Sequence, residues 1–163
     1  MTNTKPCLKL ICEIDTDDFN GISGFDLGDM TLIGELGQCT SKGHTPDQSM
    51  MIFLSLPDIL DGIRKILSSS GRKQYEFVGI DSSFMVLFTK ESDGHVVVNC
   101  HKKKISMLTD KEFAISIWKG VQNFLLEKGR LLLKNDFAVE DLSSSVNQFE
   151  IFLHKYDVEP SVR

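Results

Sequence analysis

The feature that most constrains the fold is a series of three short strand patterns packed closely along the chain, at residues 74–81, 84–90 and 95–101. Segments rich in Ser, Asp and Gly separate them. One of these segments, Ser92-Asp93-Gly94, contains the dipeptide Asp-Gly, which is a strong local signal for a hairpin turn. The spacing therefore predicts consecutive antiparallel strands of one sheet.

The middle pattern differs from its neighbours because its apolar residues do not alternate with polar ones. Residues 84–88 read Phe-Met-Val-Leu-Phe without a break. A continuous apolar run is typical of a strand that is covered on both faces. We therefore expect this strand to lie centrally in the sheet, with both of its faces buried.

A helix start follows directly after the strand patterns. Thr109 and Glu112 have the spacing of a capping box, in which each residue satisfies a backbone N–H group of the other. Gly129 is a natural end for this helix. One apolar stripe at helical spacing is formed by Ala114, Ile117, Trp118, Val121 and Leu125.

The remaining elements are predicted from shorter patterns. Ser55, Pro57 and Asp58 indicate a second helix start, and an apolar face of Ile59, Ile63, Ile66 and Leu67 follows it. The last segment, 139–156, fits an amphipathic helix, with a strand at 149–153 as the competing interpretation. Strands are expected at 8–14, 30–36 and 49–54, and a loop is expected at 37–48.

Together these patterns predict an α+β fold. We expect a mainly antiparallel sheet of about five to six strands. A helix should follow the third strand, and one or two C-terminal helices should pack on one face. With 163 residues and 41% hydrophobic side chains, the chain suits a single globular domain over residues 1–163. Within it, an acidic strand pair at about 7–36 precedes a charge-balanced body at about 49–156.

The whole net charge of −5 is carried by the first 36 residues, where seven acidic side chains oppose only Lys5 and Lys9. Such a surface repels nucleic acid and attracts a basic partner. The one concentrated basic run, at residues 102–104, reads as a solvated turn rather than as a phosphate-binding stripe. Nucleic acid is therefore not an expected partner.

Residue types that carry chemistry lack the required spacing. Residues 15–26 resemble a calcium loop, but Phe19 and Asn20 stand at positions five and six, where an oxygen ligand and glycine are needed. Neither a zinc-ligand pattern nor a known catalytic motif is found, so we expect no metal, no cofactor and no catalytic residues. The four cysteines have no framework spacing, which favours reduced thiols in a cytoplasmic protein. The apolar runs are too short to cross a membrane.

Residues 55–124 carry a resemblance to a known family. The stretch contains Leu56-Pro57-Asp58-Ile59-Leu60-Asp61, then residues 75–81, the apolar run 84–88, residues 93–98 and the helix opened by Glu112-Phe113. This order resembles that of immunity proteins of bacterial polymorphic-toxin systems, including contact-dependent growth inhibition and WapI-like immunity proteins. The resemblance implies a cytoplasmic, non-enzymatic protein that binds and neutralises a cognate toxin domain, often a basic nuclease.

The candidate partner-binding residues are acidic. A rival hypothesis is a small adaptor or secretion chaperone that binds its partner through an apolar groove, and a third is an enzyme with dispersed acid and base residues. The candidates comprise five residues of the N-terminal segment and two at turns of the sheet: Asp15, Asp17, Asp18, Asp26 and Asp29, then Asp81 and Asp93.

Overall fold

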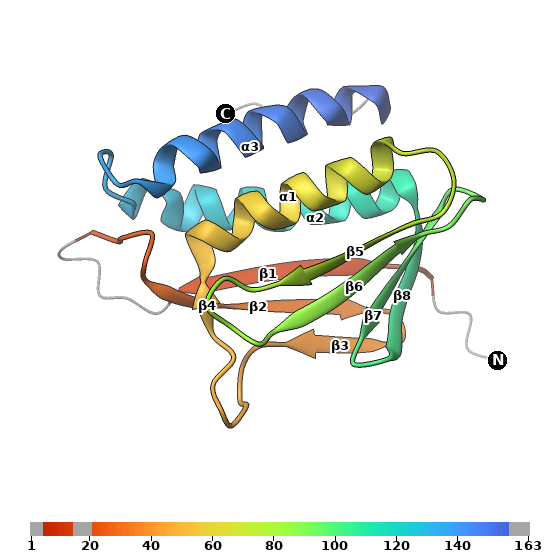
Figure 1. Ribbon diagram of the computed structural model, residues 1–163, viewed down its shortest axis with the longest axis horizontal. Helices are drawn as coiled ribbons and strands as arrows, with labels where there is room; N and C mark the ends of the chain where they lie inside the picture. Colours follow the sequence, from red (N-terminus) through yellow and green to blue (C-terminus); the bar gives the residue numbers. More distant parts are fainter. Residues whose placement is uncertain (1–4, 15–20, 157–163) are drawn as a thin grey trace.

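The computed structural model describes residues 5–14 and 21–156 and has an α+β fold. It contains two antiparallel sheets of four strands each and three α-helices. The helices lie on one side of the sheets, in two layers (Figure 1). The predicted fold class is confirmed, but the expectation of one sheet with five to six strands is wrong, because the strands divide between two sheets.

The first sheet consists of β1 (Leu8–Ile14), β2 (Leu27–Gly34), β3 (Gly37–Thr40) and β4 (Met50–Met51). β1 pairs with one edge of β2 along its whole length, so that Leu8 lies opposite Gly34. β3 and β4 pair with successive stretches of the other edge of β2. Alternate side chains of β1 are buried, which gives this sheet one apolar face.

The second sheet is a meander in the order β5-β6-β7-β8, with every neighbouring pair antiparallel. The closely spaced patterns of the sequence correctly predict the first three strands of this meander. A register shift between Val98 and Asn99 marks a bulge in the pairing of the last two strands. The strands are β5 (Lys73–Val78), β6 (Met85–Lys90), β7 (His95–Cys100) and β8 (Lys103–Thr109).

The three helices are α1 (Ile52–Ser68), α2 (Asp110–Lys128) and α3 (Ala138–Leu153). α2 packs on β1, α1 packs on β5, and α3 covers the side of α1 that faces away from the sheets (Figure 1). α3 also contacts α2, because the rings of Trp118 and Phe149 stack with centroids 5.9 Å apart. The helix expected at 139–156 is therefore confirmed in preference to the strand.

The capping box at the start of α2 is present as the sequence predicts. The Thr109 hydroxyl accepts from the Glu112 backbone N–H at 3.2 Å, and the Glu112 carboxylate accepts from the Thr109 N–H at 3.2 Å. Gly120 lets this helix approach the sheet closely, since a Cβ at that position would lie 2.5 Å from the carbonyl oxygen of Leu10. The apolar stripe of α2 thereby reaches the core.

The other helix start differs from the prediction. α1 begins at Ile52, so residues 49–54 form a strand only at Met50–Met51. Ser55 is buried inside the helix and does not cap it. Its hydroxyl donates to the carbonyl oxygen of Met51 and accepts from the backbone N–H of Ile80, each at 3.0 Å. Because a buried N–H group needs a partner, this serine joins the helix to the second sheet.

The prediction that residues 84–88 are covered on both faces is also wrong. Phe84, Val86 and Phe88 are buried, whereas Met85 is exposed and Leu87 is half-buried. The run therefore has one core face and one open face that carries apolar side chains. β6 nevertheless lies inside the sheet, between β5 and β7, as expected.

The sequence analysis does not predict two of the strands. β3 falls in the segment predicted as a loop, and β8 begins in the lysine run predicted as a solvated turn. The two central residues of the hairpin between β7 and β8, His101 and Lys102, have positive φ angles of 50° and 66°. Neither is glycine or asparagine, so the usual sequence signal for such a turn is missing.

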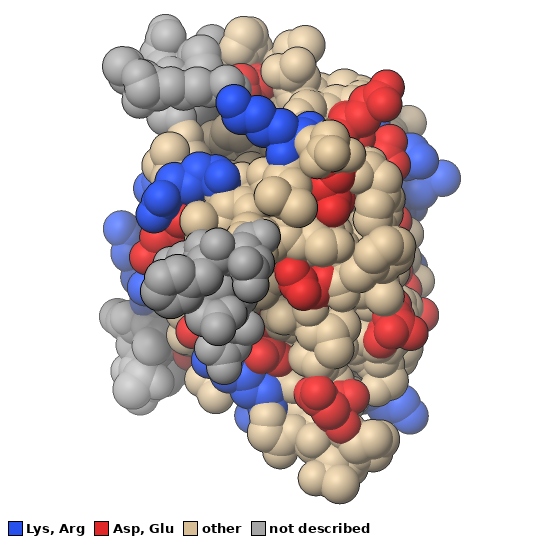
Figure 2. All heavy atoms as spheres, turned by 90° about the vertical axis from the view of Figure 1, so that its left-hand side faces the viewer, with Lys and Arg blue, Asp and Glu red and all other residues tan. Residues whose placement is uncertain are grey.

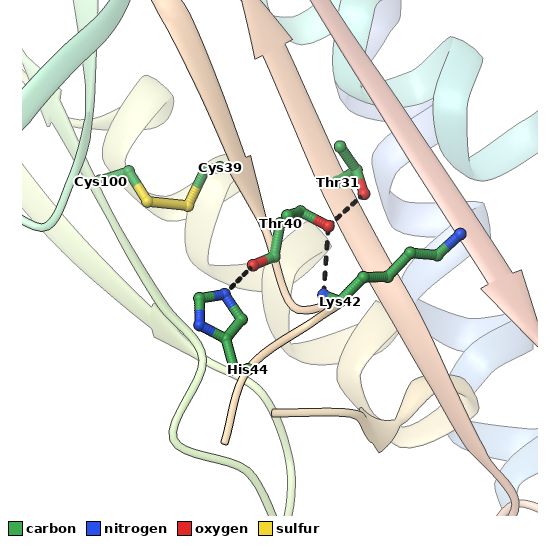
Figure 3. Close-up of a disulfide and its surroundings, with 6 residues drawn as sticks. All are labelled: Thr31, Cys39, Thr40, Lys42, His44 and Cys100. Carbon is green, nitrogen blue, oxygen red and sulfur yellow. Dashed lines mark hydrogen bonds between the residues drawn. A yellow bond between two sulfur atoms is a disulfide. The ribbon is translucent and has the colours of Figure 1, made fainter. Parts of the chain in front are cut away.

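The two sheets are joined where the β2–β3 turn meets β8. The Leu36 N–H donates to the carbonyl oxygen of Ile105 at 3.0 Å. Gly34 permits this approach, because a Cβ there would lie 2.0 Å from the same oxygen. Further along, a disulfide links Cys39 of β3 to Cys100 of β7 (Figure 3). The expectation that these cysteines are reduced thiols is thus wrong: pairing of distant strands brings them together, which spacing along the chain cannot reveal.

Glu35, in the same turn, connects three segments. Its carboxylate accepts from the backbone N–H groups of Cys7 at 3.3 Å and Met107 at 3.2 Å. Desolvation raises the pKa of Glu35, but these hydrogen bonds and one with the Ser106 side chain outweigh it, so its pKa lies below the ordinary value of 4.5. This acidic residue of the N-terminal segment therefore has a structural role.

Replacing Glu35 with Gln is expected to lower the free energy of unfolding by roughly 1 kcal/mol at pH 7, because charge-assisted hydrogen bonds are lost. A lowered pKa stabilises the fold above the unfolded-state value of about 4.5, and this contribution disappears as pH falls through the folded-state pKa. The difference in the free energy of unfolding between wild type and variant should therefore become smaller below about pH 5. Urea unfolding at pH 7 and pH 4 measures this difference. An equal difference at both pH values would contradict the role of the charged Glu35 carboxylate as a hydrogen-bond acceptor.

Candidate functional site

The structure brings three carboxylates together in a groove of about 360 Å³ between α1 and α3. Asp58 and Asp61 come from α1, and Asp141 comes from the first turn of α3. Among the described residues, no Lys or Arg lines this groove. Arg64, which lies 3.7 Å from Asp61, offsets part of one charge, and the groove keeps a net negative charge that favours positively charged groups.

Side chains around the groove hold these carboxylates in place. The Ser145 hydroxyl donates to Asp61 at 3.2 Å, and the Arg64 guanidinium lies 3.7 Å from the other oxygen of the same carboxylate. The Tyr75 hydroxyl donates to the carbonyl oxygen of Asp58 at 2.9 Å. Burial, together with the nearby charge of Asp58, raises the pKa of Tyr75, so this hydroxyl stays protonated as a donor.

Two of the acidic residues expected to bind a partner lie at the same end of the molecule as the groove. Met51 pairs with Leu27, which follows Asp26 in the sequence. The Met51 N–H donates to the carbonyl oxygen of Ile80, which precedes Asp81. Ile80 itself lines the groove. Figure 2 shows this end: acidic side chains lie across the middle and right of the face, and basic ones lie toward its upper left, its lower centre and its edges. We call Asp26, Asp58, Asp61, Asp81 and Asp141 the acidic end.

Asp29 does not contribute to this surface as an unpaired charge. Its carboxylate accepts from the Ser41 hydroxyl at 2.7 Å, and Glu13 lies opposite it on β1. Lys42 forms an ion pair with Glu13. The hydrogen bond that Lys42 donates to Glu13, with the charges of Glu13 and Asp29, raises the pKa of Lys42. The local charge is thus partly neutralised within the protein.

The other predicted residues fall elsewhere. Asp93 lies in the turn between β6 and β7, whereas Asp81 lies before β6, so the length of that strand separates them by about 20 Å. Asp93 accepts from the His95 backbone N–H at 3.2 Å. The structure therefore does not bring Asp81 and Asp93 onto one surface. Asp15, Asp17 and Asp18 lie outside the described residues.

Sequence patterns alone do not single out Asp61 or Asp141 as site residues, and they give Asp58 only as a capping candidate. Asp61 and Asp141 are 80 positions apart in the sequence, and only the packing of α3 on α1 makes them neighbours. Each alone reads as an ordinary solvated charge on a helix. The one available signal was the position of Asp58 and Asp61 three residues apart, which places both on one helix face.

Groups that could support catalysis or metal binding show little sign of activation. Burial, with a smaller effect of the Glu13 charge, raises the pKa of Cys12 to about 12, so its thiol stays protonated. His44 is hydrogen-bonded to the carbonyl oxygen of Thr40 at 2.8 Å (Figure 3). Within residues 5–14 and 21–156, His, Cys, Asp and Glu side chains form no group of three suited to a metal ion. No helix in these ranges is long and apolar enough to span a bilayer.

Comparison with known proteins identifies no relative: no family model, curated protein or solved structure matches the chain. The fold and the site thus define the chain as an α+β protein with an acidic surface at one end.

Proposed function

We propose that this chain is a non-enzymatic immunity protein that neutralises a cognate toxin domain by binding it through the acidic end. The observation that carries the proposal is the groove between α1 and α3, where three carboxylates meet without a lining Lys or Arg among the described residues. The resemblance of residues 55–124 to immunity proteins of polymorphic-toxin systems points to the same class of partner.

The chemistry of such a partner fits the charge of this surface. A nuclease domain binds phosphate groups with Lys and Arg side chains, so its substrate surface is basic. Carboxylates at the acidic end would attract that surface, raise the association rate and cover it. Two further carboxylates at this end, Asp26 and Asp81, extend the attraction beyond the groove.

Replacing Asp58 and Asp141 with Asn is expected to slow association with the toxin domain by roughly tenfold at low salt, because two exposed charges are lost. The difference should shrink at high salt as the field is screened. The probe is a purified toxin domain, found by co-purification with this chain or encoded by an adjacent gene, and stopped-flow mixing at two ionic strengths measures the rates. The matched control is Glu76→Gln with Asp93→Asn, which removes the same amount of charge from the second sheet, away from the acidic end.

The proposal also requires protection in cells. Expression of that toxin domain should arrest growth, and co-expression of this chain should restore it. Failure of the wild-type chain to bind or protect would refute the proposed function. Equal association rates for the two double variants would leave neutralisation possible but would remove the acidic end as the surface that steers it.

A second candidate function is favoured by an apolar groove between α2 and α3. Leu125, Leu142 and Val146 line this hollow of about 400 Å³. An adaptor or secretion chaperone would bind an apolar segment of its client there. Val146→Asp should then abolish client binding, whereas Asp58→Asn with Asp141→Asn should leave client binding unchanged.

A further inference from the structure

Four large apolar side chains are exposed together at the end of the molecule that carries the acidic end. Phe25 and Leu27 belong to the segment that enters β2, and Leu133 and Phe137 belong to the loop before α3; they are between 48% and 61% exposed. The rings of Phe25 and Phe137 lie against each other, with centroids 4.5 Å apart. We call these four residues the apolar patch.

The two segments that carry the apolar patch are tied together by their backbones. The Ile22 N–H donates to Leu131 at 2.8 Å, and the Leu133 N–H donates back to Ile22 at 3.2 Å. The Gly24 N–H donates to the Asp136 carboxylate at 3.1 Å. Figure 1 shows both segments at one end of the fold, beside the start of α3. The patch is therefore held in place before any partner binds, which lowers the entropic cost of binding.

Packing of the fold does not account for this exposure. Single exposed apolar residues are common in proteins, and Leu126 and Ile151, each 68% exposed, are examples in this chain. Phe25 and Phe137 differ from these because their exposed rings lie against each other, and clustered exposed apolar area marks interaction surfaces. Aromatic side chains are the ones most enriched at the centres of interfaces.

The charges around the apolar patch identify the kind of partner. Asp26 lies between Phe25 and Leu27 in the sequence, and Glu140 is exposed in the first turn of α3. Asp141, next to Glu140, lines the acidic groove. Lys134 in the loop and the exposed Arg130 just before it are the nearby opposing charges. Acidic groups thus predominate at the border of the patch, and a partner that covers it gains by presenting Lys or Arg around an apolar centre.

We infer that the apolar patch is the buried centre of the interface with the basic toxin domain, and that the acidic end is its charged border. This inference rests on the proposed function and adds the residues that hold the complex together. Charged residues at a border mainly set the association rate, whereas buried aromatic residues at a centre mainly set the dissociation rate.

The test compares dissociation rates of the complex with the toxin domain, measured by surface plasmon resonance. Phe25→Ser with Phe137→Ser should raise the dissociation rate by about 30-fold or more and change the association rate by less than about threefold. Leu126→Ser with Ile151→Ser removes equally exposed apolar side chains on the helices and should change neither rate. The single variant Phe137→Ser is measured in the same way as the double variant. Circular dichroism and thermal unfolding of every protein check that the fold is retained.

The outcomes separate this inference from the proposed function. If the wild-type chain binds and protects while the Phe25 and Phe137 variant dissociates as slowly as wild type, the apolar patch is not the interface centre and only this inference fails. If wild type dimerises in sedimentation experiments and Phe137→Ser makes it monomeric, a second copy occupies the patch and the inference is also overturned. If wild type neither binds nor protects, the proposed function fails, and the inference fails with it.

Discussion

Replacing Ile117 with Asp is expected to prevent the chain from accumulating as a folded protein. Ile117 is completely buried in the stripe of α2 that faces the core. A carboxylate at this site has no positive partner, and burial of an unpaired charge costs at least about 4 kcal/mol. That is a large share of the stability of an ordinary domain, which is about 5–15 kcal/mol. The yield of soluble protein and thermal unfolding measure the effect.

Two controls separate the effect of burial from the effect of substitution. Ile117→Val removes one methylene and should cost only about 1 kcal/mol. Leu126→Asp places the same charge in the same helix at an exposed position and should be tolerated. Normal yield and unchanged melting of Ile117→Asp would show that this face of α2 does not lie in the core.

Removal of the Cys39–Cys100 disulfide is expected to produce the second large effect. The two cysteines are 61 residues apart, and closing a loop of that length restricts the unfolded chain. In the chain-entropy treatment the free energy of unfolding then falls by about 4 kcal/mol when the bond is removed. Urea unfolding of the oxidised protein with and without reductant measures the change.

The free cysteines provide the controls for this experiment. Cys39→Ala with Cys100→Ala should be as unstable as the reduced wild type and should not respond to reductant. Cys7→Ser should keep the full response, because Cys7 takes no part in the bond. A thiol count of two in the unfolded, unreduced protein confirms the pairing, and a count of four in protein taken directly from cells would mean that the bond does not form there. The expected cytoplasmic location stays a prediction, which this count bears on.

Local patterns determined much of the secondary structure. The capping box of Thr109 and Glu112 and the stripe through Ile117 predict α2, because capping and helical periodicity depend on residues within a few positions of each other. The three closely spaced strand patterns predict β5, β6 and β7 of the meander for the same reason. α3 also follows its amphipathic pattern, in which Leu142, Phe149 and Leu153 face the core.

Other features of the fold depend on neighbours that are distant in the sequence. Residues 84–88 lack cover on one face because the helices lie on the other side of the sheet. Ser55 resembles a cap in the sequence, but in the fold it is buried and bonded to Ile80. The division into two sheets is set by contacts such as that between Leu36 and Ile105, for which no local pattern exists.

The sequence by itself determined the excess of acidic charge in the first 36 residues, because composition and net charge do not depend on folding. Only the tertiary structure decided which carboxylates lie close together. It separated Asp93 from Asp81 and joined Asp61 to Asp141 across two helices. It also brought Phe25 beside Phe137. A binding surface is a set of neighbours in space, and packing of distant segments creates those neighbours.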